Sequence, residues 1–187
     1  MANRCILQIA LLLSFSTISL SLSYKLLQAQ QRSSSLACGE LLKQLKGKPE
    51  YCLKDRMDFK FPEEIKQPQH FRKENAALVI QEMLQNILDI VRKNFSNTVW
   101  NETIVENLLV ELHQQMDSLK TLLQEILEKK DITWEDTMII PRLKGYYWRI
   151  RRHMKAKDNS ICAWTVVQVE LSRNFSFINR LTDYFQD

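Results

Sequence analysis

The side chains in this 187-residue chain that could carry out chemistry are four cysteines and three histidines. A thiol beside an imidazole can act as a nucleophile, and two histidines four positions apart on a helix can hold zinc. His70, His113 and His153 lie far apart with no pair at that spacing, which disfavours a zinc site. Cys38 falls on the inward stripe of an expected helix, where thiols are usually inert. We therefore expect neither a metal site nor an enzyme.

Glycine is too scarce in the sequence for a phosphate-binding loop. The three glycines (Gly39, Gly47 and Gly145) are scattered, whereas nucleotide-binding turns need several within a few residues. We expect no cofactor. Because tight turns need glycine and proline, the low content of both also argues against an all-β fold and favours a few long helices.

The N-terminus has the pattern of a signal peptide. A basic residue precedes Ile6–Phe15, an apolar run of about ten residues, and Ser19 and Ser21 place small residues before a cleavage point. The run is too short to cross a bilayer, which takes about 20 apolar residues. We expect residues 1–21 to be removed and residues 22–187 to form one secreted, extracellular domain without membrane insertion.

Export through an oxidising compartment favours disulfide formation. Cys5 would leave with the signal peptide, so Cys38, Cys52 and Cys162 remain, and sequence alone does not fix their connectivity. Cys52 lies in a polar segment and Cys162 opens the last apolar helix. Periodicity therefore favours a Cys52–Cys162 disulfide, with Cys38 left as a buried free thiol.

Apolar residues recur at steps of three and four in five segments, which predicts five helices. Their ranges are 24–45, 71–92, 100–130, 133–157 and 161–185. The segment between the first two, residues 46–70, is a long loop of the kind that usually carries function. A long first connection lets neighbouring helices run parallel. We therefore expect an all-α fold: a five-helix up-up-down-down bundle of the cytokine type with a long first crossover loop.

The formal net charge of +4 is too small to indicate a nucleic-acid partner. The segment 133–157 is nevertheless strongly basic, with Arg142, Lys144, Arg149, Arg151, Arg152, Lys155 and Lys157. A solvated charged face opposite an apolar stripe is the commoner explanation. The alternative is a cationic secreted defence protein that binds glycans or acts on membranes.

Six segments, spread over nearly the whole chain, resemble the type I interferon family. The loop segment Cys52-Leu-Lys-Asp-Arg-Met-Asp-Phe59 is followed by Phe61-Pro-Glu-Glu64, and Tyr146-Tyr147-x-Arg149-Ile150 is followed by Cys162-Ala163-Trp164. The segments Trp100–Leu109 and Arg173–Leu181 narrow the resemblance to one branch of the family. His153 and Met154 depart from the family pattern, which has an aromatic residue or leucine followed by leucine.

The resemblance implies a secreted ligand that brings together both chains of the interferon alpha/beta receptor and activates Janus kinases and STAT factors. Antiviral, antiproliferative and immunomodulatory responses would follow. It also implies the Cys52–Cys162 disulfide. In the family, the first long loop and the last helix bind one receptor chain tightly, and the second to fourth helices face the other. We expect a monomer.

Position by position, the resemblance carries receptor-binding roles to the long loop and the last helix. Leu53 and Arg56 match the loop residues, and the matching positions on the last helix are Gln168, Val169, Ser172, Arg173 and Ser176. Helical periodicity places Val169, Ser172, Arg173 and Ser176 on the exposed side. An exposed valine beside an arginine is typical of a binding patch.

Three sequons, at Asn94, Asn101 and Asn174, are candidate glycosylation sites in a secreted chain. Asn94 and Asn101 flank the break before the third helix, so we expect both to be accessible. Asn174 lies near the apolar arc of the last helix, where a glycan would compete with packing.

Overall fold

The computed structural model describes residues 24–45, 47–67, 71–94, 100–129 and 138–185. A first helix covers residues 24–44. The elements that follow are η1 (Pro49–Asp55), α2 (Glu63–Lys66), α3 (Lys73–Asn94), α4 (Glu102–Lys129), α6 (Ile139–Ala156), α7 (Ile161–Leu181) and η3 (Thr182–Phe185). No strand occurs in these ranges, which confirms the all-α prediction.

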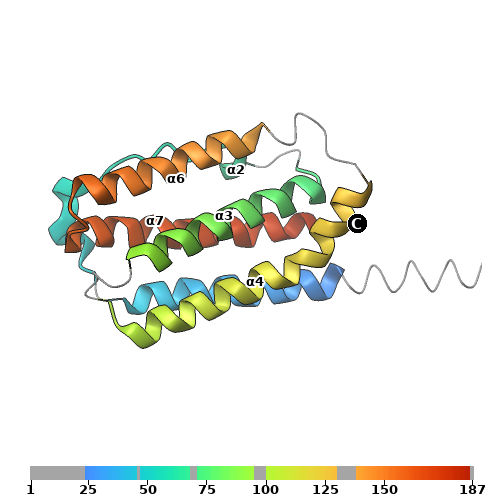
Figure 1. The fold of residues 1–187 in the computed structure, drawn as a ribbon, viewed down its shortest axis with the longest axis horizontal. Helices are drawn as coiled ribbons and strands as arrows, with labels where there is room; N and C mark the ends of the chain where they lie inside the picture. The colour runs from blue at the N-terminus through green and yellow to red at the C-terminus, as the bar shows by residue number, and fades with distance from the viewer. Residues whose placement is uncertain (1–23, 46, 68–70, 95–99, 130–137, 186–187) are drawn as a thin grey trace, which may run out of the picture.

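The helices form one bundle in which the first helix and α3 run in the same direction, while α4 and α7 run in the opposite direction (Figure 1). These four give the up-up-down-down order, and α6 is added beside α7, parallel to α3. The chain between the first helix and α3 travels the length of the bundle. This long crossover is what permits the parallel first pair.

The predicted helices are all present, with boundaries shifted by a few residues at most of their ends. Part of the fourth expected helix, and the whole proposed signal segment, lie outside the described residues. Pro141 sits in the first turn of α6, where its missing N–H costs no hydrogen bond. Ser160 caps α7 by accepting from the N–H of Ala163 at 3.2 Å. Within the described ranges, no helix is both long and apolar enough to cross a membrane.

The core is centred on α3, which packs against α4, α6 and α7. Its inward residues recur at helical spacing and are almost fully buried: Ala76, Val79, Ile80, Met83, Leu84, Ile87 and Val91. Burying each of the larger side chains contributes about 1.5 to 3 kcal/mol. Because α3 packs against three other long helices, it is the central element of the bundle.

A buried polar seam joins the first helix to α4. Gln31 donates to the carbonyl of Gln115 at 2.7 Å, and Ser35 donates to the side-chain oxygen of Gln115 at 3.1 Å. The amide of Gln115 also donates to the Cys38 sulfur at 3.3 Å. Buried polar groups need such partners, and a one-turn slip of either helix would leave them unpaired. The seam therefore sets the register of this helix pair.

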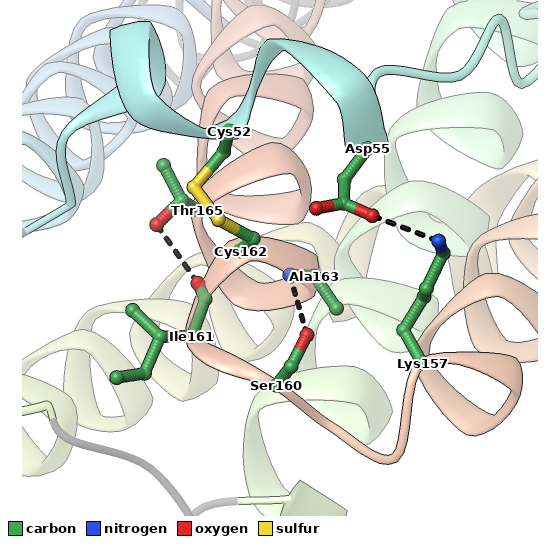
Figure 2. The surroundings of a disulfide bond; sticks show 8 residues. All are labelled: Cys52, Asp55, Lys157, Ser160, Ile161, Cys162, Ala163 and Thr165. Atoms are coloured by element: carbon green, nitrogen blue, oxygen red, sulfur yellow. Dashed lines mark hydrogen bonds and ion pairs between the residues drawn. A yellow bond between two sulfur atoms is a disulfide. The ribbon is translucent and has the colours of Figure 1, made fainter.

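A disulfide between Cys52 and Cys162 ties the long loop to the start of α7, as predicted, and Cys38 is the buried free thiol. Figure 2 shows the bond between η1 and the first turn of α7, with the Lys157–Asp55 ion pair, 2.8 Å long, on its flank. The two cysteines are 110 positions apart. The bond thus brings the loop against a helix that is remote in sequence.

Aromatic side chains of the same loop enter the core beyond the disulfide. Phe59 and Phe61 are buried, and the ring of Phe61 stacks on Phe177 of α7 with centroids 4.5 Å apart. The Phe61 ring also packs edge-to-face with the Tyr146 ring of α6, with centroids 4.9 Å apart. These apolar contacts fix a segment that has little regular structure of its own.

Arg149 of α6 holds the loop backbone between those two rings. Its Nε donates to the carbonyl of Phe59 at 2.8 Å and its Nη2 to that of Lys60 at 3.1 Å. Lys60 has a φ of +55°, a left-handed conformation that costs energy for a residue with a Cβ. The arginine bonds stabilise this turn and keep both phenylalanines directed inward.

Two further basic residues of this region hold the loop by ion pairs. Arg142 pairs with Glu64 of α2, and Lys157, just beyond α6, pairs with Asp55 of η1. Two of the six basic residues of α6, Arg142 and Arg149, thus contact the loop. The imidazole of His153, also on α6, packs edge-on against Phe59 with centroids 5.4 Å apart.

We expect the disulfide and the free thiol to contribute very differently to stability. Cys52→Ser or Cys162→Ser should lower the free energy of unfolding by about 4 to 5 kcal/mol, the chain-entropy value for a loop of this length. Cys38→Ser should lower it far less, since the hydroxyl can still accept from Gln115. Urea unfolding followed by circular dichroism compares the three variants. A loss for Cys38→Ser as large as for Cys52→Ser would contradict this ranking.

We also expect stability to fall as the pH drops below neutral because of His153. Burial, and next the positive charge of Lys157, lower the pKa of His153, while Asp55 raises it. The unfolded histidine, with a pKa near 6.5, therefore binds its proton at a higher pH than the folded one. Its contribution is present above the unfolded pKa and is lost as the pH falls through the folded pKa.

His153→Phe keeps an aromatic ring against Phe59 and removes the titratable imidazole. The difference in urea midpoint between pH 7.5 and pH 5 should shrink in this variant. An unchanged difference would show that other groups cause the acid sensitivity.

Candidate functional site

The loop and α7 enclose an open groove of about 260 Å³ at one end of the bundle. Leu53 and Arg56 come from η1 and the turn after it, and Val169 and Arg173 come from α7. The lining residues are Pro49, Glu50, Leu53, Arg56, Met57, Thr165, Val166, Val169, Glu170 and Arg173. The structure therefore brings together four of the predicted site residues on one surface.

The groove is lined by exposed apolar side chains and by charged groups. Leu53 is 58% exposed, Met57 46% and Val169 42%, although large apolar side chains are usually buried. Arg56 and Arg173 place guanidinium groups beside them. Exposed apolar side chains next to arginines are the composition of a protein–protein hot spot rather than of a catalytic centre.

Glu170 forms an ion pair with the guanidinium of Arg173. Arg173 Nη1 lies 3.2 Å from Glu170 Oε2 within the same helix, and the Glu170 side chain is largely buried. Its other oxygen, Oε1, accepts from the hydroxyl of Tyr146 at 3.0 Å. The carboxylate therefore links an exposed arginine to a side chain of the core.

A buried hydrogen-bonded cluster continues beneath this carboxylate. The amide of Asn174 donates to the Tyr146 oxygen at 2.7 Å and to the Glu170 carbonyl at 2.8 Å, and its Oδ1 accepts from Tyr147 at 2.5 Å. Burial, together with nearby negative charge, raises the pKa of Tyr146 and of Tyr147. Both hydroxyls stay protonated at neutral pH and act as donors, which rigidifies the helix behind the groove.

Ser172 and Ser176 do not line the groove. The hydroxyl of Ser172 donates to the carbonyl of Gln168 at 3.0 Å, and that of Ser176 donates to the carbonyl of Ser172 at 3.4 Å. Ser176 is exposed and Ser172 is half-buried. They lie on the same outward side of α7 but contribute small surfaces that already bond to their own helix.

Gln168 is not a surface contact, contrary to the role that the family resemblance carries to its position. It is buried, and its amide donates to the carbonyls of Leu42 at 2.6 Å and Leu45 at 3.0 Å, so it caps the end of the first helix. Gly47 lies against it, since a Cβ there would come within 2.7 Å of the Gln168 oxygen. Gln168 therefore has a structural role. Gly47, just after the first helix, was the sequence signal that another group lies close to the backbone there.

Sequence reasoning missed several lining residues, among them Met57, Val166 and Glu170. Val166 and Glu170 could have been found from their spacing, because 166, 169, 170 and 173 recur at the i, i+3, i+4, i+7 positions of one helix face. Met57 could not, since no periodicity governs an irregular loop.

The other candidate chemistries have weak support. Burial, and next the charge of Glu111, raise the pKa of the Cys38 thiol to about 12, so the reactive thiolate is scarce at neutral pH. Among the residues that the structure describes, no three histidine, cysteine, aspartate or glutamate side chains gather as a metal ion would require.

The three sequons occupy different surroundings. Asn101 is exposed, and its Oδ1 accepts from the N–H of Ile104 at 3.3 Å at the start of α4. Asn94 is the last residue of α3, and its side chain lies outside the described part. Asn174 is fully buried, with both hydrogens of its amide nitrogen in hydrogen bonds.

Comparison with known proteins identifies the relatives of this chain. A family model described as "Interferon alpha/beta domain" matches residues 27–185. The chain is 60% identical to interferon beta of Macaca fascicularis and 59% identical to that of Homo sapiens, in each case over 100% of both chains. It is 34% identical to interferon epsilon of Sus scrofa, over 97% of this chain and 95% of that protein.

We expect glycans at Asn101, also at Asn94, and little or none at Asn174. A glycan on the Asn174 amide would have to displace the tyrosine cluster and enter the core. Site-resolved glycopeptide mass spectrometry of the protein secreted from mammalian cells measures the three occupancies. A folded, active fraction with Asn174 mostly modified would contradict the expected burial of this side chain.

Proposed function

The chain belongs to the interferon alpha/beta family and is a type I interferon cytokine, not an enzyme; from this we propose that the groove between η1 and α7 is its tight contact with one chain of the type I interferon receptor. The observation that carries the proposal is the convergence of Leu53, Arg56, Val169 and Arg173 on one groove. These are four of the seven residues to which the family resemblance assigns this role.

The groove suits an apolar side chain of the receptor flanked by acidic or carbonyl groups. Leu53 and Val169 offer the apolar contact, and Arg56 and Arg173 can each make paired hydrogen bonds through a planar guanidinium. The disulfide fixes the loop next to α7 and Glu170 pairs with Arg173 before binding, which reduces the conformational entropy lost on association. This supports a tight interaction from a small surface.

We further propose that the cytokine acts as a secreted monomer in the extracellular space after removal of residues 1–21, and that residues 22–187 form the active domain. Its α3, α4 and α6 side would contact the second receptor chain, so that one ligand brings two receptor chains together. The roles of Ser172 and Ser176 would be peripheral, as their hydroxyls bond within α7.

The alternative of a cationic defence protein rested on the basic fourth helix. Arg142, Arg149 and Lys157 in this region contact the long loop, which gives part of that charge a structural explanation. As the principal function this alternative has less support than receptor binding.

We expect Arg56→Ala to weaken binding to the tight receptor chain by about tenfold or more, since truncating a central arginine of a hot spot costs at least ~2 kcal/mol. Lys54→Ala is the matched control, because it removes one exposed charge from the same loop without touching the groove. Surface plasmon resonance against each receptor ectodomain measures the effect, and thermal unfolding should be nearly unchanged in both variants.

Arg173→Ala should weaken the same interaction less, because Glu170 already neutralises part of that charge in the free cytokine. Equal affinities for wild type, Arg56→Ala and Lys54→Ala would remove the loop from the binding site. Signalling that persists in cells lacking the receptor would overturn the proposal as a whole.

A further inference from the structure

The outward side of α6 carries a concentration of positive charge that receptor binding in the η1–α7 groove does not use. Between Ile139 and Ala156 there are six lysines and arginines and no aspartate or glutamate. Because the whole chain has a formal net charge of only +4, the rest of the protein is slightly acidic. The positive charge of the molecule is therefore concentrated along this one helix.

A second open pocket, of about 440 Å³, lies where this helix meets the long loop. It is lined by Lys60, Pro62, Pro141, Arg142, Gly145 and Arg149, so the described residues around it include three cations and no carboxylate. Gly145 forms part of the wall, and the position that a Cβ would take there is 3.4 Å from Arg149 Nη1. The absent side chain keeps the guanidinium open to the pocket.

The charge of Arg149 is not neutralised by any carboxylate within ion-pair distance in the part of the chain that the structure describes. Its hydrogen bonds go to the neutral carbonyls of Phe59 and Lys60. Lys60 and Arg142 do have carboxylate partners, Asp58 and Glu64, but these are exposed pairs. Such pairs contribute little free energy and can exchange partners with an incoming anion.

An exposed tryptophan extends the pocket along the helix. Trp148 is 53% exposed, although an indole is usually largely buried, and the guanidinium of Arg152 lies 5.2 Å from its ring centroid. Gly145, Trp148 and Arg152 recur at steps of three and four, so they share one helix face and span about 10 Å. The same face thus offers an anion pocket, a flat apolar ring and a further cation in a row.

We propose that this face, defined by Lys60, Arg142, Gly145, Arg149, Trp148 and Arg152, binds a sulfated polysaccharide of the heparin type. A sulfate group occupies the pocket and accepts hydrogen bonds from the guanidinium groups, whose fork geometry suits tetrahedral oxyanions. The adjoining sugar packs its apolar ring face on Trp148, and the next sulfate reaches Arg152. The site is separate from the η1–α7 groove.

The surroundings of α6 favour a glycan over other polyanions. A helix that lies on a membrane needs a free apolar face, whereas the apolar side of α6 is buried, including Leu143, Tyr147 and Ile150. Single-stranded nucleic acid is bound by several stacking aromatic side chains, whereas Trp148 is the one large aromatic residue exposed on this helix. A rigid row of cations around a single ring matches a linear sulfated sugar.

The test is binding of the full mature cytokine to a defined heparin oligosaccharide, measured by isothermal titration at 0.15 M salt. Gly145→Leu keeps every charge but fills the pocket, and we expect it to lower the affinity about fivefold or more. It should not unfold the protein, because leucine favours a helix interior more than glycine does. Arg152→Ala should have a similar effect, and Trp148→Ala should reduce affinity without changing charge.

Lys120→Ala, which removes one exposed charge from α4, is the matched control and should change the affinity less than twofold. The proposal is overturned by any of three results: no heparin binding by the wild type, wild-type affinity for Gly145→Leu, or an equal loss for Lys120→Ala. Binding of desulfated heparin, RNA or phosphatidylserine vesicles as tightly as heparin would also overturn it. Thermal unfolding of each variant separates these outcomes from loss of fold.

Discussion

The attachment of the long first loop to the bundle is the constraint on which both proposed binding surfaces depend. The loop has only short helical turns of its own, and three kinds of contact hold it: the Cys52–Cys162 disulfide, the buried rings of Phe59 and Phe61, and hydrogen bonds from Arg149. The disulfide restricts the unfolded chain, whereas the rings and the arginine select one folded path. Without them Leu53 and Arg56 would have no fixed position relative to α7.

The second feature that shapes the groove is the polar cluster beneath α7. Asn174, Tyr146 and Tyr147 would each be costly to bury alone, but together they satisfy one another and support Glu170. Glu170 therefore connects Tyr146 in the core to Arg173 at the surface. The same burial is the reason that we expect little or no glycan at Asn174, although its sequon is complete.

The basic side chains of α6 serve more than one purpose on a single helix. Arg149 faces the loop carbonyls with two of its nitrogens and the second pocket with the third. A positive helix therefore does not by itself indicate a polyanion ligand, because loop carbonyls and carboxylates take up part of the charge. What distinguishes the outward face is the open pocket at Gly145 and the exposed ring of Trp148.

The sequence by itself determined the five helices, the inward position of Cys38 and the exposed side of α7, because apolar periodicity reports directly on which face of a helix is buried. The motif resemblance indicated the family and the loop residues Leu53 and Arg56. Only the tertiary structure decided that Gln168 caps the first helix, that Met57 joins the groove and that Gly145 opens a pocket beside Arg149. Those outcomes depend on contacts between segments far apart in the chain, and local patterns carry no information about which remote groups a side chain will meet.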